Sequence, residues 1–287
     1  MLPFLKQTSQ KDVAPEPVRL ELSGPLLADA LKILLAGAEA QGGVERYAEA
    51  LSLKSLMFRD ALAGGRAEHL DIDAFMGLCT FMATVRRRIG PYLDGGGFAR
   101  IKGAILQLLD GSDDTSTTDE RWRAFCAMFP EDKKHRWVRD LAAEVLHNTD
   151  PERYPLMCRW IWDARANTGV IREIWHADNI DHLTIPVPDG YDTYVQLRQE
   201  LSEYLTSNGV FKDVMSYVDL LCAQVYAGYI SAQGGSYLKA DFTSEVDPME
   251  HTRRILGLDG VKPGSSKTRL RSIDGEAFTL DDVKLLD

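Results

Sequence analysis

The sequence predicts an all-α protein: a multi-helix bundle with a small C-terminal β-hairpin appendage and a loose N-terminal arm. Over most of residues 23–235, apolar residues recur three and four positions apart, a spacing that only a helix places on one side. Stretches rich in Gly, Pro and Asp separate these stripes, as helix ends do. A chain of 287 residues that is 45% hydrophobic and 26% charged is typical of a folded globular protein, which excludes disordered, collagen-like and disulfide-knotted classes.

The first part of the chain predicts an arm and a helical subdomain. Residues 1–22 contain three prolines among polar residues and predict a flexible arm with room for a short strand at 18–22. Residues 23–110 predict an N-terminal helical subdomain, because four stripes follow one another there. The stripes are Leu27, Leu31, Leu34 and Leu35; Tyr47, Ala48, Leu51 and Met57; Ile72, Phe75, Cys79, Met82 and Ile89; and Ile101, Ile105 and Leu108.

The second part of the chain predicts a helical core and an extension. Residues 110–119 contain no apolar side chain and are the candidate linker. Residues 119–235 predict the C-terminal helical core, ending in long helices over about 191–206 and about 210–233. The last helix is apolar over most of its circumference and is expected at the centre of the core. Residues 236–287 predict a basic and acidic C-terminal extension that holds the hairpin signal Asp274-Gly275.

Charge and cysteine usage limit the compartment and the partners. The net charge of −10 repels phosphate backbones, so nucleic-acid binding would need a local basic patch. No CxxC motif occurs, and Cys79 and Cys222 lie in apolar stripes, where buried reduced thiols are expected. No apolar stretch reaches membrane length. These features predict a cytoplasmic protein with no membrane partner.

Two Glu-x-x-His motifs are the sharpest chemical pattern. They pair Glu144 with His147 and Glu173 with His176, and residues three apart on a helix project to the same side. Two such motifs with further carboxylates form the ligand set of helical di-iron proteins. The apolar arcs around each motif nevertheless predict that both turn toward water, where they would make only surface contacts. No cofactor is therefore predicted, and Fe or Zn is the alternative.

A run of potential ligands follows the second motif. His176, Asp178 and His182 lie within seven residues, between a helix and the Pro186 turn, where a loop could gather them around Zn²⁺. The alternative interpretation is a helix end followed by Asx-type turns.

Aromatic and basic residues predict contact surfaces. All five tryptophans lie between residues 122 and 175, and most of them are expected in the core. Trp162 would lie on a different side of a helix from Trp160 and is the candidate interface residue. Residues 251–272 carry six basic side chains against Asp259, and could bind an anion or nucleic acid or fold back on the acidic end of the chain. The candidate basic contacts are Arg253, Arg254, Lys267, Arg269 and Arg271. The consecutive Arg86-Arg87-Arg88 fan over most of a helical turn and are not expected to form one patch.

The function favoured by these patterns is an accessory or regulatory subunit that acts through protein–protein contacts. No hydrolase elbow, Walker loop or dinucleotide fingerprint is present. Two alternatives stay open: a metal-dependent enzyme using Fe or Zn at the Glu-x-x-His motifs, and an anion or nucleic-acid binder acting through residues 251–272.

Overall fold

The computed structural model describes residues 18–39, 42–234 and 249–261. Helices dominate these residues, which confirms the all-α class. Their β pairing is limited to two isolated antiparallel bridges, Leu22 with Trp175 and Asp163 with Thr168. The C-terminal hairpin predicted around Asp274-Gly275 lies outside the described residues.

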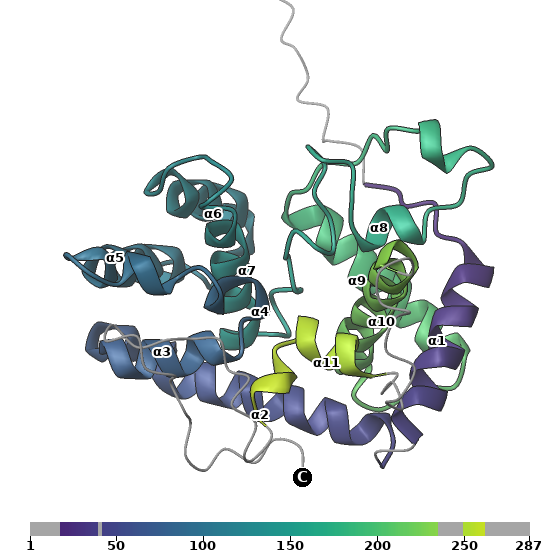
Figure 1. The fold of residues 1–287 in the computed structure, drawn as a ribbon, viewed down its shortest axis with the longest axis horizontal. Coiled ribbons are helices and arrows are strands. Elements are labelled where there is room, and N and C mark those ends of the chain that lie inside the picture. Colours follow the sequence, from purple (N-terminus) through teal and green to yellow (C-terminus); the bar gives the residue numbers. More distant parts are fainter. Residues whose placement is uncertain (1–17, 40–41, 235–248, 262–287) are drawn as a thin grey trace, which may run out of the picture.

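The helices gather in two halves that a long helix spans (Figure 1). One half holds α3 (Ile72–Thr80), α4 (Ala83–Arg86), α5 (Gly97–Leu109), α6 (Thr118–Ala127) and α7 (Trp137–Thr149), with the short 3₁₀ helices η1 (Arg66–His69), η2 (Gly90–Tyr92) and η3 (Thr115–Thr117). The other half holds α1 (Gly24–Glu39), α8 (Val170–Glu173), η4 (Ile180–His182), α9 (Tyr191–Ser207) and α10 (Val214–Gly234). The spanning helix is α2 (Val44–Leu62), which packs on both α7 and α10.

A short C-terminal unit lies between the halves. It consists of α11 (Glu250–Ile255) and η5 (Leu258–Val261), and α11 contacts α10 of one half and α4 of the other. Gly257 has a φ of +75°, and a Cβ there would lie 1.8 Å from the carbonyl oxygen of Phe81. A glycine is needed at this turn because both the backbone conformation and the close approach exclude a side chain.

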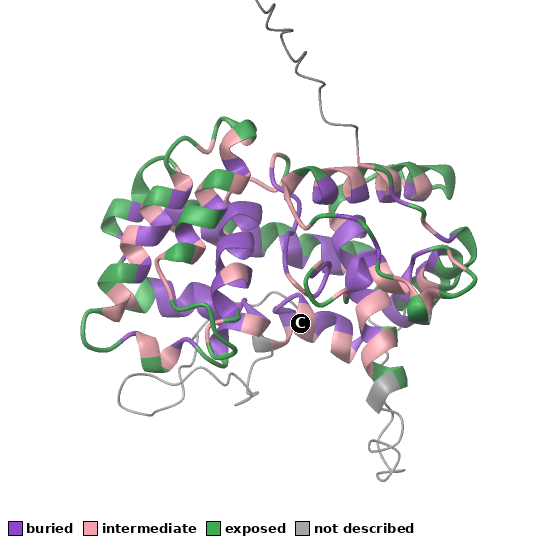
Figure 2. Cartoon of the chain, turned by 90° about the horizontal axis from the view of Figure 1, so that it is seen from above, coloured by how far each residue is buried: buried purple, intermediate pink, exposed green. Residues whose placement is uncertain are grey.

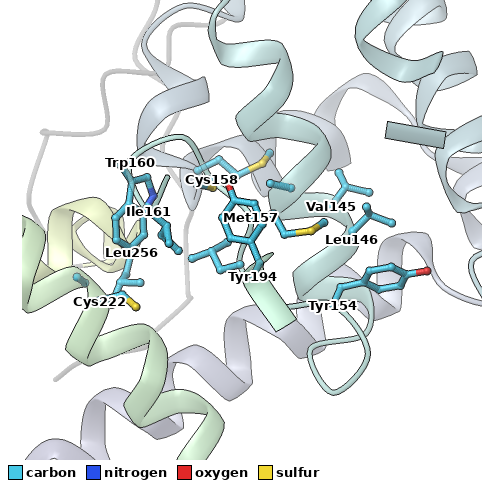
Figure 3. Close-up of a cluster of buried hydrophobic side chains, with 14 of the residues drawn as sticks. Val145, Leu146, Tyr154, Met157, Cys158, Trp160, Ile161, Tyr194, Cys222 and Leu256 are labelled. Atoms are coloured by element: carbon cyan, nitrogen blue, oxygen red, sulfur yellow. The ribbon is translucent and has the colours of Figure 1, made fainter. Parts of the chain in front are cut away.

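The buried core is continuous across both halves (Figure 2). Helix α10 contacts α1, α2, α8, α9 and α11, which agrees with its predicted place at the centre. An irregular segment, residues 154–161, also runs through the core, and Figure 3 shows its side chains gathered with those of α7, α9 and α10. Cys79 and Cys222 are buried free thiols, as predicted.

Several local expectations were wrong. The stripe from Ile72 to Ile89 forms two helices rather than one, because α3 ends at Thr80 and the Thr80 carbonyl accepts a hydrogen bond from the Arg86 guanidinium instead of continuing a helix. Residues 18–22, the described part of the expected loose arm, pack on the body: Leu20 is buried and Leu22 pairs with Trp175.

Within the described residues, every helix is either too short or too polar to span a lipid bilayer.

Candidate functional site: an arginine-lined cleft

A cleft of about 420 Å³ opens where the two halves meet α11. Its walls come from α4 and the turn after it, the first turn of α7, Arg159, α10 and α11. Its basic side chains are Arg87, Arg88, Arg136, Arg159, Arg254 and His251. We call this hollow the arginine cleft. Small-molecule sites commonly have volumes of about 300–1,000 Å³ and lie between structural units, as this one does.

The turn after α4 explains how consecutive arginines divide between the core and the cleft. Arg86 is buried and donates to both carboxylate oxygens of Asp259, at 2.6 and 2.7 Å. Arg87 and Arg88 are exposed and line the cleft, and Arg88 also donates to the Lys133 carbonyl oxygen at 3.1 Å. The triplet thus does not form one patch, as predicted, but Arg87 and Arg88 line the same cleft because α4 ends after Arg86 and the chain turns there.

The opposite side of the cleft is the start of α7. Arg136 precedes the helix and is exposed, while Asp140 in the first turn is buried. One carboxylate oxygen of Asp140 accepts the backbone N–H of Arg159 at 2.9 Å. Burial raises the pKa of the Asp140 carboxyl, and the Arg159 N–H and guanidinium oppose that rise. The helix N-terminus adds a partial positive charge to this side of the cleft.

Charge in the cleft is opposite in sign to that of the chain. Among the described residues, Asp140 is the only acidic side chain in the lining, although the net charge of the protein is −10. Arg159 is neutralised by Asp163 at 3.0 Å, and Arg254 by Glu250. Among the described residues, no carboxylate forms an ion pair with Arg88 or Arg136. These two guanidinium groups are thus available to an anion from solution.

A second hollow of about 850 Å³ adjoins the arginine cleft and shares Arg136 and Arg159 with it. Its charges are closer to balance than those of the cleft, since each of its four carboxylates pairs with a basic side chain and only Lys133 and the shared Arg136 remain. The pairs are Arg165 with Glu131 at 2.7 Å, His135 with Asp132 at 2.9 Å, Arg159 with Asp163 at 3.0 Å and Arg139 with Asp189 at 2.6 Å. The excess positive charge is therefore concentrated in the smaller cleft.

Glu144 of the first predicted metal motif lies in a buried ion pair. Its side chain is 2% exposed, receives the Lys54 ammonium at 2.8 Å and accepts the Asn148 amide at 2.9 Å. The expectation that this motif faces water was wrong, because α7 is surrounded by α2, α4, α5 and α6 and has no outer face at this level.

His147 of the same motif is also buried, with a protein partner at each ring nitrogen. Its Nδ1 lies 2.9 Å from the Tyr154 carbonyl oxygen and its Nε2 lies 3.1 Å from Asp219. Burial alone would lower the pKa of His147, but the Asp219 carboxylate and the Tyr154 carbonyl raise it above its ordinary value. These contacts favour an imidazolium, which cannot ligate a metal.

The other predicted metal residues lie near the surface. Glu173 is half-buried at the end of α8, while His176, Asp178 and His182 are exposed. The backbone N–H of His176 donates to the backbone carbonyl oxygen of Glu21 at 2.7 Å, which connects this segment to the residues before α1. In the part of the chain that the structure describes, no three His, Cys, Asp or Glu side chains are arranged to hold a metal ion.

Two of the three predicted interface residues that the structure describes are buried. Trp162 is fully buried, and its indole N–H donates to the Val187 carbonyl oxygen at 3.0 Å. Its expected exposure was wrong because residues 159–161, directly before it, form a turn rather than the helix on which the expectation was based. Arg253 is buried as well, whereas Arg254 reaches the arginine cleft. Lys267, Arg269 and Arg271 lie outside the described residues.

Sequence reasoning missed the arginine cleft, although the Arg86-Arg87-Arg88 triplet was a visible signal for it. No protein-family model, curated protein or solved structure matches this chain. The case for a function therefore depends on the residues and geometry of the cleft itself.

Proposed function

We propose that the protein binds a small phosphate-bearing ligand in the arginine cleft. The observation that carries the proposal is the pair Arg88 and Arg136, which open into a concave site without a described carboxylate partner in a chain of net charge −10. Guanidinium groups suit phosphate oxygens because two of their N–H donors can bind two oxygens at once. The N-terminus of α7 also favours a negatively charged ligand.

The proposal retains one part of the anion-binding alternative. That alternative used residues 251–272, and the described basic side chains of this stretch that line the cleft are His251 and Arg254. The accessory-subunit function stays a prediction, and two of its proposed contacts, Trp162 and Arg253, are buried. The metal-enzyme alternative is not favoured, because Glu144 and His147 are already engaged with Lys54 and Asp219.

Isothermal titration with inorganic pyrophosphate tests this function. Wild-type protein should bind pyrophosphate at low ionic strength, and added salt should weaken the binding. Arg136→Ala and Arg88→Ala should each weaken it about 10-fold or more, since a hydrogen bond to a charged group contributes about 1.5–3 kcal/mol.

Arg100→Ala is the matched control, because Arg100 is an exposed arginine on α5 that does not line the cleft. This variant has the same net charge as Arg136→Ala. Equal affinities of the two variants would show that the anion responds only to net charge, and an absence of binding by the wild type would exclude the proposed function.

A further inference from the structure

The arginine cleft has two chemically different sides. Arg87, Arg88 and Arg136 line one side, from the turn after α4 and the start of α7. On the other side, an apolar strip is formed by Tyr226, Ala227 and Ile230 of α10 with Ile255 of α11, and α11 also contributes the basic His251 and Arg254 to the lining. Residues 226, 227 and 230 share one face of α10 because of their helical spacing. A ligand that fills the cleft therefore needs an anionic end and an apolar end.

Tyr226 gives the apolar side a fixed aromatic ring. Its ring centroid lies 5.6 Å from that of Trp160 and 6.1 Å from that of Tyr229. Burial raises the pKa of the Tyr226 phenol, so the ring stays uncharged at neutral pH. A ring held in this way presents a surface on which a planar group can pack without first losing conformational freedom.

We propose that the phosphate-bearing ligand is a free nucleotide, with its base against Tyr226 and its phosphates at Arg88 and Arg136. This inference rests on the function proposed above. A sugar phosphate alone would leave the apolar side of the cleft in contact with water, whereas a base covers apolar surface and gains stacking energy.

The surroundings of the cleft favour a mononucleotide over a strand of nucleic acid. A strand needs a basic track that continues along its backbone. The adjoining second hollow continues the positive charge only weakly, because each of its four carboxylates is paired with a basic side chain and only Lys133 adds a further cation to the shared Arg136. The cleft itself, at about 420 Å³, has the size of a small-molecule site.

A comparison of ATP with inorganic tripolyphosphate, both in the presence of EDTA, tests the inference. Tripolyphosphate carries at least as much negative charge, so tighter binding of ATP cannot come from charge. We expect ATP to bind the full-length protein about five-fold more tightly or better, since stacking on an aromatic side chain contributes about 1–3 kcal/mol per base.

Tyr226→Leu should reduce the ATP affinity to that of tripolyphosphate and leave the tripolyphosphate affinity unchanged. Tyr204→Leu is the control, because Tyr204 is a half-buried tyrosine of α9 outside the cleft. Circular dichroism would verify that both variants are folded. If Tyr226→Leu weakens both ligands equally, the ring supports the shape of the cleft and does not contact a base, which overturns the inference.

Failure of this inference can be told apart from failure of the proposed function. Equal binding of ATP and tripolyphosphate by the wild type would overturn the nucleotide while leaving the phosphate site intact. If the wild type binds neither ATP nor tripolyphosphate, both the nucleotide and the phosphate site are excluded. Tighter binding of a single-stranded octanucleotide than of ATP would overturn the mononucleotide in favour of nucleic acid.

Discussion

Lys54 is a buried cation that joins three helices, and its removal should destabilise the protein strongly. Its ammonium lies 2.8 Å from Glu144 of α7 and donates to the carbonyl oxygen of Leu256, directly after α11, at 2.9 Å. The two charged side chains are 3% and 2% exposed. Lys54→Met keeps most of the aliphatic volume, so the substitution removes the charge and its hydrogen bonds while leaving little cavity.

The expected loss in the free energy of unfolding is about 3–5 kcal/mol, because Glu144 is left as a buried charge without its counter-ion. The double variant Lys54→Met/Glu144→Met removes both charges. It should recover part of that loss and retain a deficit of about 1–3 kcal/mol, since the Leu256 carbonyl oxygen still lacks its donor.

Urea denaturation followed by far-ultraviolet circular dichroism measures these differences. Lys32→Met is the control, because Lys32 is exposed on α1 and should change the stability by less than about 0.5 kcal/mol. The reasoning is refuted if Lys54→Met lies within about 1 kcal/mol of the wild type, or if the double variant is as unstable as the single one.

Two further predictions concern the turn after α11 and the buried histidine. Gly257→Ala should lower the free energy of unfolding by more than about 2 kcal/mol, since the new Cβ would lie 1.8 Å from the Phe81 carbonyl oxygen at a φ of +75°. Gly228 lies on α10 with open space around it, so Gly228→Ala should raise the free energy of unfolding by about 0.5–1 kcal/mol. Equal urea midpoints for the Gly257→Ala and Gly228→Ala variants would contradict both predictions. For His147, the raised pKa means that the native state holds its proton more tightly, so the stabilisation is complete below about pH 6.5 and is lost as pH rises through the native pKa. The stability gap between the wild type and His147→Gln should therefore narrow with rising pH; a gap that widens would show that the Asp219 contact does not hold the proton.

The two long later helices could be predicted from the sequence because their burial follows directly from the pattern of apolar residues along each of them. The stripe over residues 191–206 corresponds to α9, Tyr191–Ser207, and the nearly continuous apolar stretch after residue 210 corresponds to α10, Val214–Gly234. For α9 the helical spacing of its apolar residues was sufficient, and for α10 the length of the nearly continuous apolar stretch was sufficient.

The orientation of Glu144 could not be predicted in the same way. An apolar arc predicts which residues avoid water only if the opposite side of the helix is exposed, and α7 contacts other helices on several sides. Its polar residues are buried because partners from distant parts of the chain reach them: Lys54 is 90 positions away from Glu144. No spacing rule within α7 contains that information.

The arginine cleft could not be predicted because it combines segments from Ala83 to Ile255. The triplet Arg86-Arg87-Arg88 was visible, but its division between core and cleft depends on where α4 ends and on the docking of Asp259 against Arg86. Both are consequences of tertiary packing.

The most direct test of the proposed function is to locate a bound phosphate analogue by anomalous X-ray diffraction from crystals of the full-length protein soaked in sodium tungstate. The structure predicts a tungsten peak in the arginine cleft within hydrogen-bonding reach of Arg88 and Arg136, displaced by added pyrophosphate and absent in Arg136→Ala crystals. Tungstate bound only elsewhere, or a cleft peak that persists in Arg136→Ala crystals, would contradict it.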